Sequence, residues 1–107
     1  MNKTGYASDP FFLKHETEPH PENPGRLTAI QNRLESSEFY NNLIPIQPRK
    51  ATAKEISRVH DSGYVASVEK SCADGVRNLD ADTVISSDSY DAALLSAGAG
   101  MKAIAQL

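Results

Sequence analysis

The segment His20-Pro21-Glu22-Asn23-Pro24-Gly25-Arg26-Leu27 restricts the path of the chain more than any other stretch. Its two prolines fix φ and push the residue before each of them toward an extended conformation. The asparagine can cap a helix, and the proline after it suits a first turn, where a missing N–H costs nothing. Leu27, Ile30 and Leu34 then recur with the spacing of one helix face. We therefore expect a loop that leads into a helix over residues 24–37.

Arg26 is the unusual residue of this segment. It falls in the first turn of the expected helix, where the positive end of the helix dipole disfavours a cation. This position favours a guanidinium that pairs with a buried acid or faces an internal cavity. A surface arginine whose stem lies along apolar side chains is an equally weighted alternative. The residues alone leave these interpretations open, and Arg26 is a candidate site residue.

Composition sets the broad class of the protein. The 107 residues are 39% hydrophobic and 23% charged, as in one small globular domain. The 11 basic and 14 acidic residues are mixed along the chain, giving a formal net charge of −3 without a basic stripe. We therefore expect no nucleic acid partner. Neither a signal peptide nor an apolar run of about 20 residues is present, so we expect a cytoplasmic protein without a membrane partner.

The residues that could bind a metal do not form a recognisable pattern. Cys72 is the only cysteine, which excludes an internal disulfide and a cysteine-rich zinc site. It lies on the apolar face of an expected helix, which indicates a small buried residue. His15, His20 and Glu22 carry suitable ligand atoms, but their spacing matches no known ligand set. We predict no metal site in this chain.

The other expected elements are short. A strand is expected at residues 4–7 and an edge strand, limited by its prolines, at residues 44–48. Residues 52–55 fit a capping box that opens a short helix. A second amphipathic helix is expected over residues 64–74, and residues 76–80 are expected to be a polar connection.

A last helix is expected over residues 88–107, capped by Ser87 or Asp88. It is apolar or small on nearly all sides, and its glycines permit close backbone approach. A domain of this size can hardly cover such a helix, and neither a glycine cap nor a basic last turn follows it. We expect a longer chain that is cut inside or just after this helix. The isolated piece is then expected to self-associate or to pack loosely.

Four segments resemble, in order and separation, the N-terminal portion of the histone deacetylase superfamily, including bacterial deacetylase-like and acetoin-utilisation proteins. They are the segment quoted above, residues 51–64 (containing Val59-His60-Asp61-Ser62-Gly63-Tyr64), Asp80-Ala81-Asp82-Thr83 and residues 89–99. The resemblance implies a three-layer α/β/α arginase/deacetylase-like domain with a central parallel sheet. Residues 1–107 would be its N-terminal part, mostly helical with one or two short strands and truncated at the C-terminal end.

The resemblance also implies an activity for the full-length parent. Family members hydrolyse N-acetyl-lysine or a related acyl amide with a zinc-bound water, a paired-histidine motif and a tyrosine. This chain ends before the segments that carry those groups. It is therefore expected to contain no catalytic residue and no zinc, and to be inactive alone. The expected partner of the parent is an acetylated lysine-containing protein or a small acyl-amide substrate.

Two residues of this chain match family site positions. Asp82 matches, with a one-residue offset, a rim aspartate that accepts hydrogen bonds from the substrate backbone. A turn-capping carboxylate is an equally weighted alternative for Asp82. Arg26 matches the arginine that lines the internal cavity below the zinc and is linked with acetate release. Two other functions stay open, namely a stand-alone helical binding or assembly module and a non-catalytic deacetylase homologue.

Overall fold

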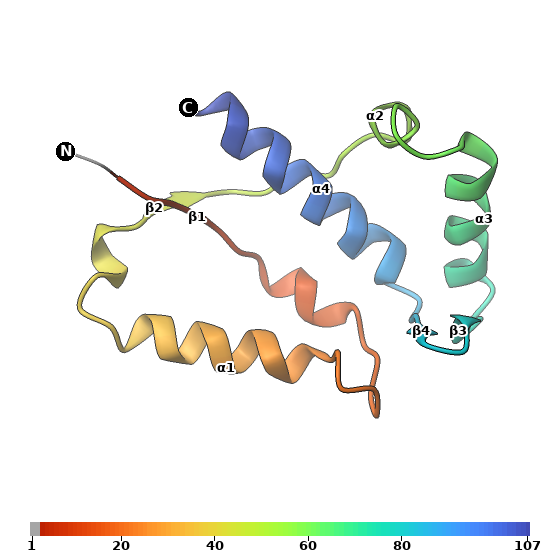
Figure 1. Cartoon of the computed structure of the whole chain (residues 1–107), viewed down its shortest axis with the longest axis horizontal. Helices are drawn as coiled ribbons and strands as arrows, with labels where there is room; N and C mark the ends of the chain where they lie inside the picture. Colours follow the sequence, from red (N-terminus) through yellow and green to blue (C-terminus); the bar gives the residue numbers. More distant parts are fainter. Residues whose placement is uncertain (1–2) are drawn as a thin grey trace.

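The longest helix, α4 (Ser89–Ala105), crosses the molecule and contacts segments from both halves of the chain (Figure 1). The computed structural model describes residues 3–107. The molecule is thin, with extents of 45, 32 and 17 Å, so few side chains are fully enclosed. In chain order, the other elements are β1 (Gly5–Ala7), the 3-10 helix η1 (Pro10–Lys14), α1 (Pro24–Glu35), the 3-10 helix η2 (Tyr40–Asn42), β2 (Ile44–Ile46), α2 (Ala53–Ile56), α3 (Ser62–Ala73), β3 (Asn78–Asp80) and β4 (Thr83–Val84).

Strands β1 and β2 form a parallel pair. Gly5 lies opposite Ile44, and Ala7 lies opposite Ile46. Pro45 lacks an N–H, which a short edge strand tolerates. A Cβ on Gly5 would lie 2.5 Å from Cδ1 of Ile46, so a larger residue there would require the Ile46 side chain to shift. Both predicted strands are confirmed, and their parallel pairing agrees with the predicted α/β class.

Helix α1 begins where the sequence predicts. Asn23 is its N-cap, and its Oδ1 accepts the N–H of Gly25 at 2.8 Å. Pro24 occupies the first turn. The helix ends at Glu35, slightly before the predicted residue 37. The local capping chemistry of the segment therefore determines this helix start, as expected.

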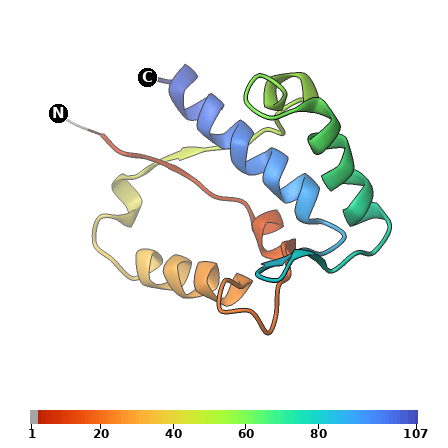
Figure 2. The same ribbon diagram turned by 45° about the vertical axis from the view of Figure 1, so that its right-hand side comes forward.

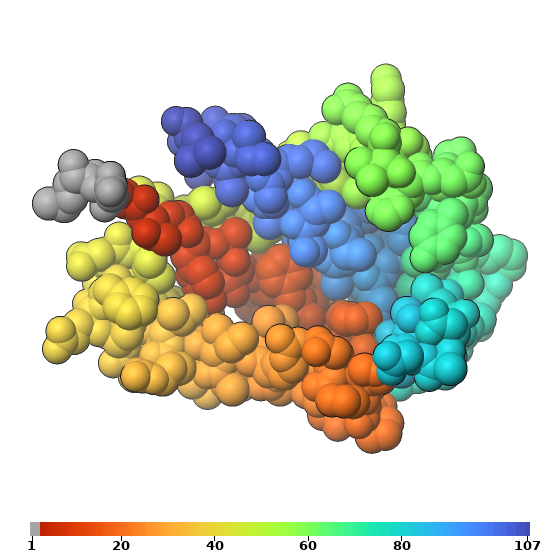
Figure 3. Space-filling model, viewed as in Figure 1, coloured from red at the N-terminus to blue at the C-terminus, as the bar shows by residue number. Residues whose placement is uncertain are grey.

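An open cavity of about 970 Å³ lies between α1 and the β1–β2 pair. Tyr6, Phe12, Leu27 and Ile30 are among its lining residues. The side of α1 that faces it is incompletely covered, since Leu27 and Ile30 remain 42% and 48% exposed. The space-filling view shows gaps between the N-terminal strand and α1 (Figure 3). The apolar stripe of α1 therefore lines a hollow and not a filled core.

Helix α4 packs tightly on the segment that follows β2. The N–H of Ala51 donates to the carbonyl of Leu94 at 2.9 Å. One turn further along, a Cβ on Gly98 would lie 1.6 Å from the carbonyl oxygen of Arg49. Gly98 and its neighbour Ala99 are buried. The expectation that glycines of this helix permit close backbone approach is confirmed at Gly98, where backbone meets backbone.

The capping box predicted at residues 52–55 is present at the start of α2. The Thr52 hydroxyl accepts the N–H of Glu55 at 3.1 Å, and the Glu55 carboxylate accepts the N–H of Thr52 at 2.9 Å. Arg49 also forms two hydrogen bonds to this carboxylate, each of 2.9 Å. Together Arg49 and Thr52 lower the pKa of the Glu55 carboxyl to about 2. The ionised form of Glu55 is thus stabilised by the fold.

Two local expectations differ from the structure. Residues 76–80 were expected to be a polar connection, but β3 pairs antiparallel with β4 in a short hairpin. Strand β3 has three residues and β4 has two, which is shorter than the run of about 4–8 alternating residues that marks a strand in a sequence. Asp88 is the N-cap of α4 by position, but its side chain makes no capping hydrogen bond.

Cys72 is 2% exposed, which confirms its prediction as a buried residue. Within residues 3–107, no helix is long and apolar enough to cross a membrane.

Gly98→Ala should destabilise the protein, because its new methyl group would overlap the backbone at Arg49. Overpacking of this kind costs roughly 1–3 kcal/mol or more, which exceeds the gain from replacing a helical glycine. Gly100→Ala is the matched control, since a Cβ there meets nothing within 4 Å. It should leave the stability unchanged or raise it by up to about 1 kcal/mol. Urea unfolding followed by circular dichroism compares the two, and equal effects would contradict this packing.

Glu55→Gln should change how stability depends on pH. The folded-state pKa of Glu55 lies below its ordinary value of 4.5, so its stabilising effect is complete above that value and is lost as the pH falls toward 2. The protein with Glu55 should therefore be more stable than the variant at neutral pH, and the difference should shrink in acid. Urea midpoints at several pH values measure this. Glu38→Gln controls for removal of an exposed carboxylate, and a pH-independent difference for Glu55→Gln would refute the expectation.

Candidate functional site

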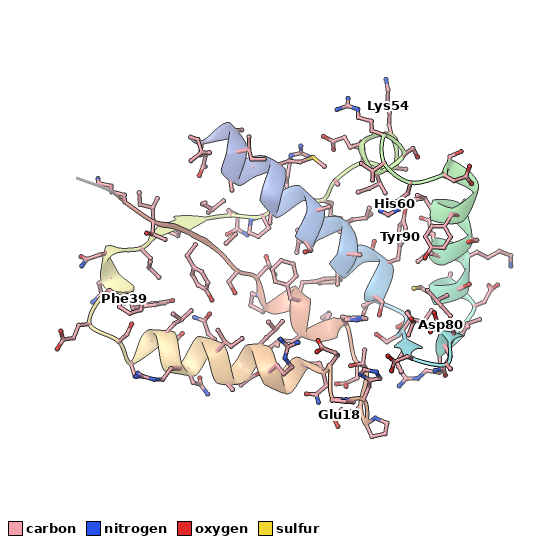
Figure 4. The ribbon with its side chains drawn as sticks, in the orientation of Figure 1. Glu18, Phe39, Lys54, His60, Asp80 and Tyr90 are labelled. Atoms are coloured by element: carbon pink, nitrogen blue, oxygen red, sulfur yellow. The ribbon has the colours of Figure 1, made fainter. Side chains whose placement is uncertain are left out.

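The loop of residues 15–23 meets the β3–β4 hairpin at one end of the molecule. Both ribbon views place this loop, between η1 and α1, beside the hairpin (Figure 2). In the stick view, Glu18 and Asp80 lie at this end, whereas Phe39 lies beyond the far end of α1 (Figure 4). Arg77 Nη2 donates to the carbonyl of Glu18 at 3.4 Å across the junction. Two distant sequence segments thus form a single surface.

Hydrogen bonds within the loop give it a fixed shape. Thr17 is 2% exposed, and its hydroxyl donates to the carbonyl of Glu22. The N–H of His20 donates to the carbonyl of Thr17 at 2.8 Å. Asn23 Nδ2 donates to the carbonyl of His20 at 3.0 Å. The backbone on both sides of His20 is therefore held by neighbouring loop residues.

His20 connects the loop to the hairpin. Its Nε2 lies 2.7 Å from Asp82 Oδ1, and its Nδ1 lies 3.0 Å from the backbone nitrogen of Glu22. An N–H group can only donate, so Nδ1 acts as the acceptor and carries no proton. In the neutral ring the proton then belongs to Nε2, which donates to Asp82. The His20 side chain is 19% exposed and that of Asp82 is 92% exposed.

Asp80, and not Asp82, supplies the carboxylate that caps the hairpin turn. Asp80 Oδ1 accepts the N–H of Asp82 at 2.9 Å. This N–H, together with the hydroxyl of Thr83, lowers the pKa of the Asp80 carboxyl. The backbone of Asp82 is thereby held, while its own carboxylate extends toward solvent and contacts His20. Asp82 can accept hydrogen bonds from a molecule that approaches this surface.

Arg26 follows the loop, in the first turn of α1. Its guanidinium pairs with the Glu22 carboxylate one turn away. The two side chains are 55% and 71% exposed, so the acid partner is a surface residue and not a buried one. Within the described residues, Arg26 does not line the 970 Å³ cavity. The guanidinium is nonetheless in position to bind a carboxylate.

The remaining histidine of the loop has a different partner. His15 Nδ1 lies 2.6 Å from the hydroxyl of Ser89, which is 7% exposed. That hydroxyl also accepts the N–H of Ser86 at 2.8 Å, and the Ser86 hydroxyl donates to the carbonyl of Lys14 at 2.9 Å. The sequence analysis did not identify this network, although the serines near residue 88 were a signal of local hydrogen bonding.

The three residues considered as metal ligands are thus engaged separately. His15 contacts Ser89, His20 contacts Asp82, and Glu22 contacts Arg26. Within residues 3–107, no group of three or more His, Cys, Asp or Glu side chains could hold a metal ion. The described residues therefore do not fit the zinc site that the resemblance implies for the parent.

Comparison with known proteins gives one consistent result. The family model of the histone deacetylase domain matches residues 20–107. The chain belongs to the histone deacetylase family. The solved HD domain of HDA15 superposes with a TM-score of 0.82 at 30% identity, over 92% of this chain and 30% of that one. The predicted family and the arginase/deacetylase fold class are confirmed, and the matched residues include the end of the loop, from His20 on, and the hairpin.

Relatives of this deacetylase-family chain come from several kinds of organism. An uncharacterized protein of Synechocystis is 39% identical over 87% of this chain and 32% of its own length. Human histone deacetylase 9 is 35% identical over 80% of this chain and 9% of its own length. A probable deacetylase of Methanothermobacter thermautotrophicus is 36% identical over 88% of this chain and 28% of its own length. The chain thus spans about a third or less of these relatives.

Ser89→Ala should destabilise the junction between the loop and α4. The substitution removes the hydroxyl that bonds to His15 Nδ1 and accepts the N–H of Ser86 at a partly buried junction. Loss of each such hydrogen bond costs roughly 0.5–1.5 kcal/mol. Ser67→Ala, at an exposed serine of α3 that bonds to its own helix, is the control and should change stability little. Equal urea midpoints for the two variants would contradict the proposed importance of the network.

Proposed function

We propose that this chain is the N-terminal part of a zinc-dependent, deacetylase-like amidohydrolase that acts on N-acetyl-lysine or a related acyl amide. The observation that carries the proposal is the histone deacetylase domain match over residues 20–107, which includes the end of the loop, from His20 on, and the hairpin. Deacetylases among the relatives support hydrolysis as the reaction class. The zinc ligands are assigned to parts of the domain outside this chain, which is inactive alone.

Asp82 is the residue of this chain proposed to contact substrate. Its carboxylate is 92% exposed on a turn whose backbone is held by Asp80. Amide N–H groups of an extended peptide are suitable donors to such a carboxylate, and bonds to a charged acceptor are stronger than neutral ones. Binding of this kind would select an acetylated lysine within a protein over a small acyl amide.

Arg26 is proposed to face the internal cavity of the complete domain and to assist release of acetate. A guanidinium presents paired donors whose geometry matches a carboxylate. In the structure, Arg26 donates one such bond, from Nη1 to Oε2 of Glu22. Acetate leaving the site could exchange with Glu22 as the partner of the guanidinium.

A non-enzymatic role is the alternative, and the open apolar cavity beside α1 is the observation that favours it. A stand-alone module that binds a partner would use such a surface, as would a non-catalytic homologue. Self-association of the isolated chain is proposed as well, because α4 is apolar or small on nearly all sides and would be only partly covered.

A cytoplasmic location is also proposed.

Asp82→Asn in the complete protein should lower kcat/KM for acetyl-lysine peptides about tenfold or more, because a hydrogen bond to a charged acceptor contributes roughly 1.5–3 kcal/mol. The loss should be smaller for small acyl amides that lack a peptide backbone. Asp74→Asn, at an exposed acid paired with Lys70, is the matched control and should leave turnover unchanged. An equal loss on both substrate types together with a lower Tm would assign Asp82 a structural role only.

Arg26→Ala should slow turnover in the complete protein while its zinc content stays unchanged, because the change removes a contact to the leaving carboxylate and no metal ligand. The control is Arg33→Ala, at the last turn of the same helix. Steady-state kinetics and metal analysis are the measurements. Unchanged kcat in Arg26→Ala would count against the proposed role.

A further inference from the structure

We propose that His20 is a positioning residue, whose Nε2–H orients the carboxylate of Asp82 for substrate. The inference rests on the proposed function, since the contact between Asp82 and substrate is part of it. The inference adds that the His20 imidazole sets the direction of the Asp82 carboxylate. That group lies 62 residues away in the sequence, on the loop before α1.

His20 is itself held in place by other residues of the loop. Its backbone N–H is bonded to Thr17, and its backbone carbonyl accepts from Asn23. Its ring Nδ1 accepts the N–H of Glu22 at 3.0 Å, which defines both the ring orientation and the tautomer. The ring is 19% exposed. His20 therefore offers a donor whose direction is set before Asp82 is considered.

Asp82 needs such a donor. The turn holds its backbone through Asp80, but the side chain is 92% exposed and could rotate in solvent. Among residues 3–107, His20 is the side chain bonded to the Asp82 carboxylate, and the 2.7 Å contact uses Oδ1. Oδ2 is left to accept a substrate N–H. Holding a binding group in its productive orientation avoids a cost that substrate would otherwise bear.

This role is separate from a contribution to folding. A hydrogen-bonded pair with one strongly exposed partner contributes little to stability. Arg77 and Ser86 also join the same two segments, at Glu18, Lys14 and Glu16. Loss of the His20–Asp82 contact should therefore leave the junction assembled. Its effect should fall on substrate binding instead.

The kinetic test uses the complete protein that contains this chain, with acetyl-lysine peptides as substrate. His20→Leu should lower kcat/KM about fivefold, mainly through KM, which is the scale of one exposed pair. His20→Gln places an amide donor near the former Nε2, and its kcat/KM should stay within about twofold of that of the unsubstituted protein. His60→Gln, at an exposed histidine of the segment before α3, controls for loss of an imidazole. The Tm should stay unchanged in all three.

A double-mutant cycle with Asp82→Ala decides whether His20 acts through Asp82. In the Asp82→Ala background, His20→Leu should cause no further loss in kcat/KM. Additive losses in the cycle, or a His20→Gln variant as impaired as His20→Leu, would overturn the proposal.

A spectroscopic test is independent of activity. In the complete protein labelled with 15N at histidine, the His20 signal should show the Nε2–H tautomer, and Asp82→Ala should shift its Nε2 resonance. A His20 ring protonated at Nδ1, or a resonance indifferent to Asp82→Ala, would overturn the inference. A complete protein without activity on any acyl amide would remove the proposed function instead, and the tautomer would still decide whether the contact exists.

Discussion

The backbone contact between α4 and the segment after β2 is the constraint on which the rest of this structure depends. Ala51 donates to the carbonyl of Leu94, and Gly98 allows the helix to rest on the carbonyl of Arg49. On one side of this contact lies the parallel β1–β2 pair, and on the other lies the capped helix α2 followed by α3. A side chain at residue 98 would overlap the Arg49 carbonyl and push the helix away from this segment.

The start of α4 connects this contact to the candidate site and holds the site's loop in place. Ser89 is buried there and bonds to His15, which begins the loop. The loop then carries His20 to the hairpin, where Asp82 stands on a turn held by Asp80. The exposed Asp82 carboxylate is thus connected to the buried Ser89 by two short hydrogen bonds and by the loop that runs from His15 to His20. This explains how a surface group on a two-stranded hairpin can keep a defined place.

The sequence predicted the features that depend on neighbouring residues. Asn23 and Pro24 define a helix start, and Thr52 with Glu55 defines another, because each cap uses atoms within three residues. The particular side-chain contacts between distant residues were not predicted. The contacts between His15 and Ser89 and between His20 and Asp82 join residues 74 and 62 positions apart. The β3–β4 hairpin was missed because its strands have only three and two residues, too few for a recognisable alternation.

Arg26 shows where sequence reasoning and structure complement each other. The helix dipole argument indicates that a cation in the first turn of α1 needs an anion nearby. The structure supplies one in Glu22, but it is exposed, and exposed pairs contribute little free energy. An unfavourable dipole with only a weak partner does not account for an arginine by stability alone. Selection for binding of a carboxylate would account for it, and the same loop that holds Glu22 also directs Asp82 through His20. The two candidate site residues therefore depend on one short, rigid loop.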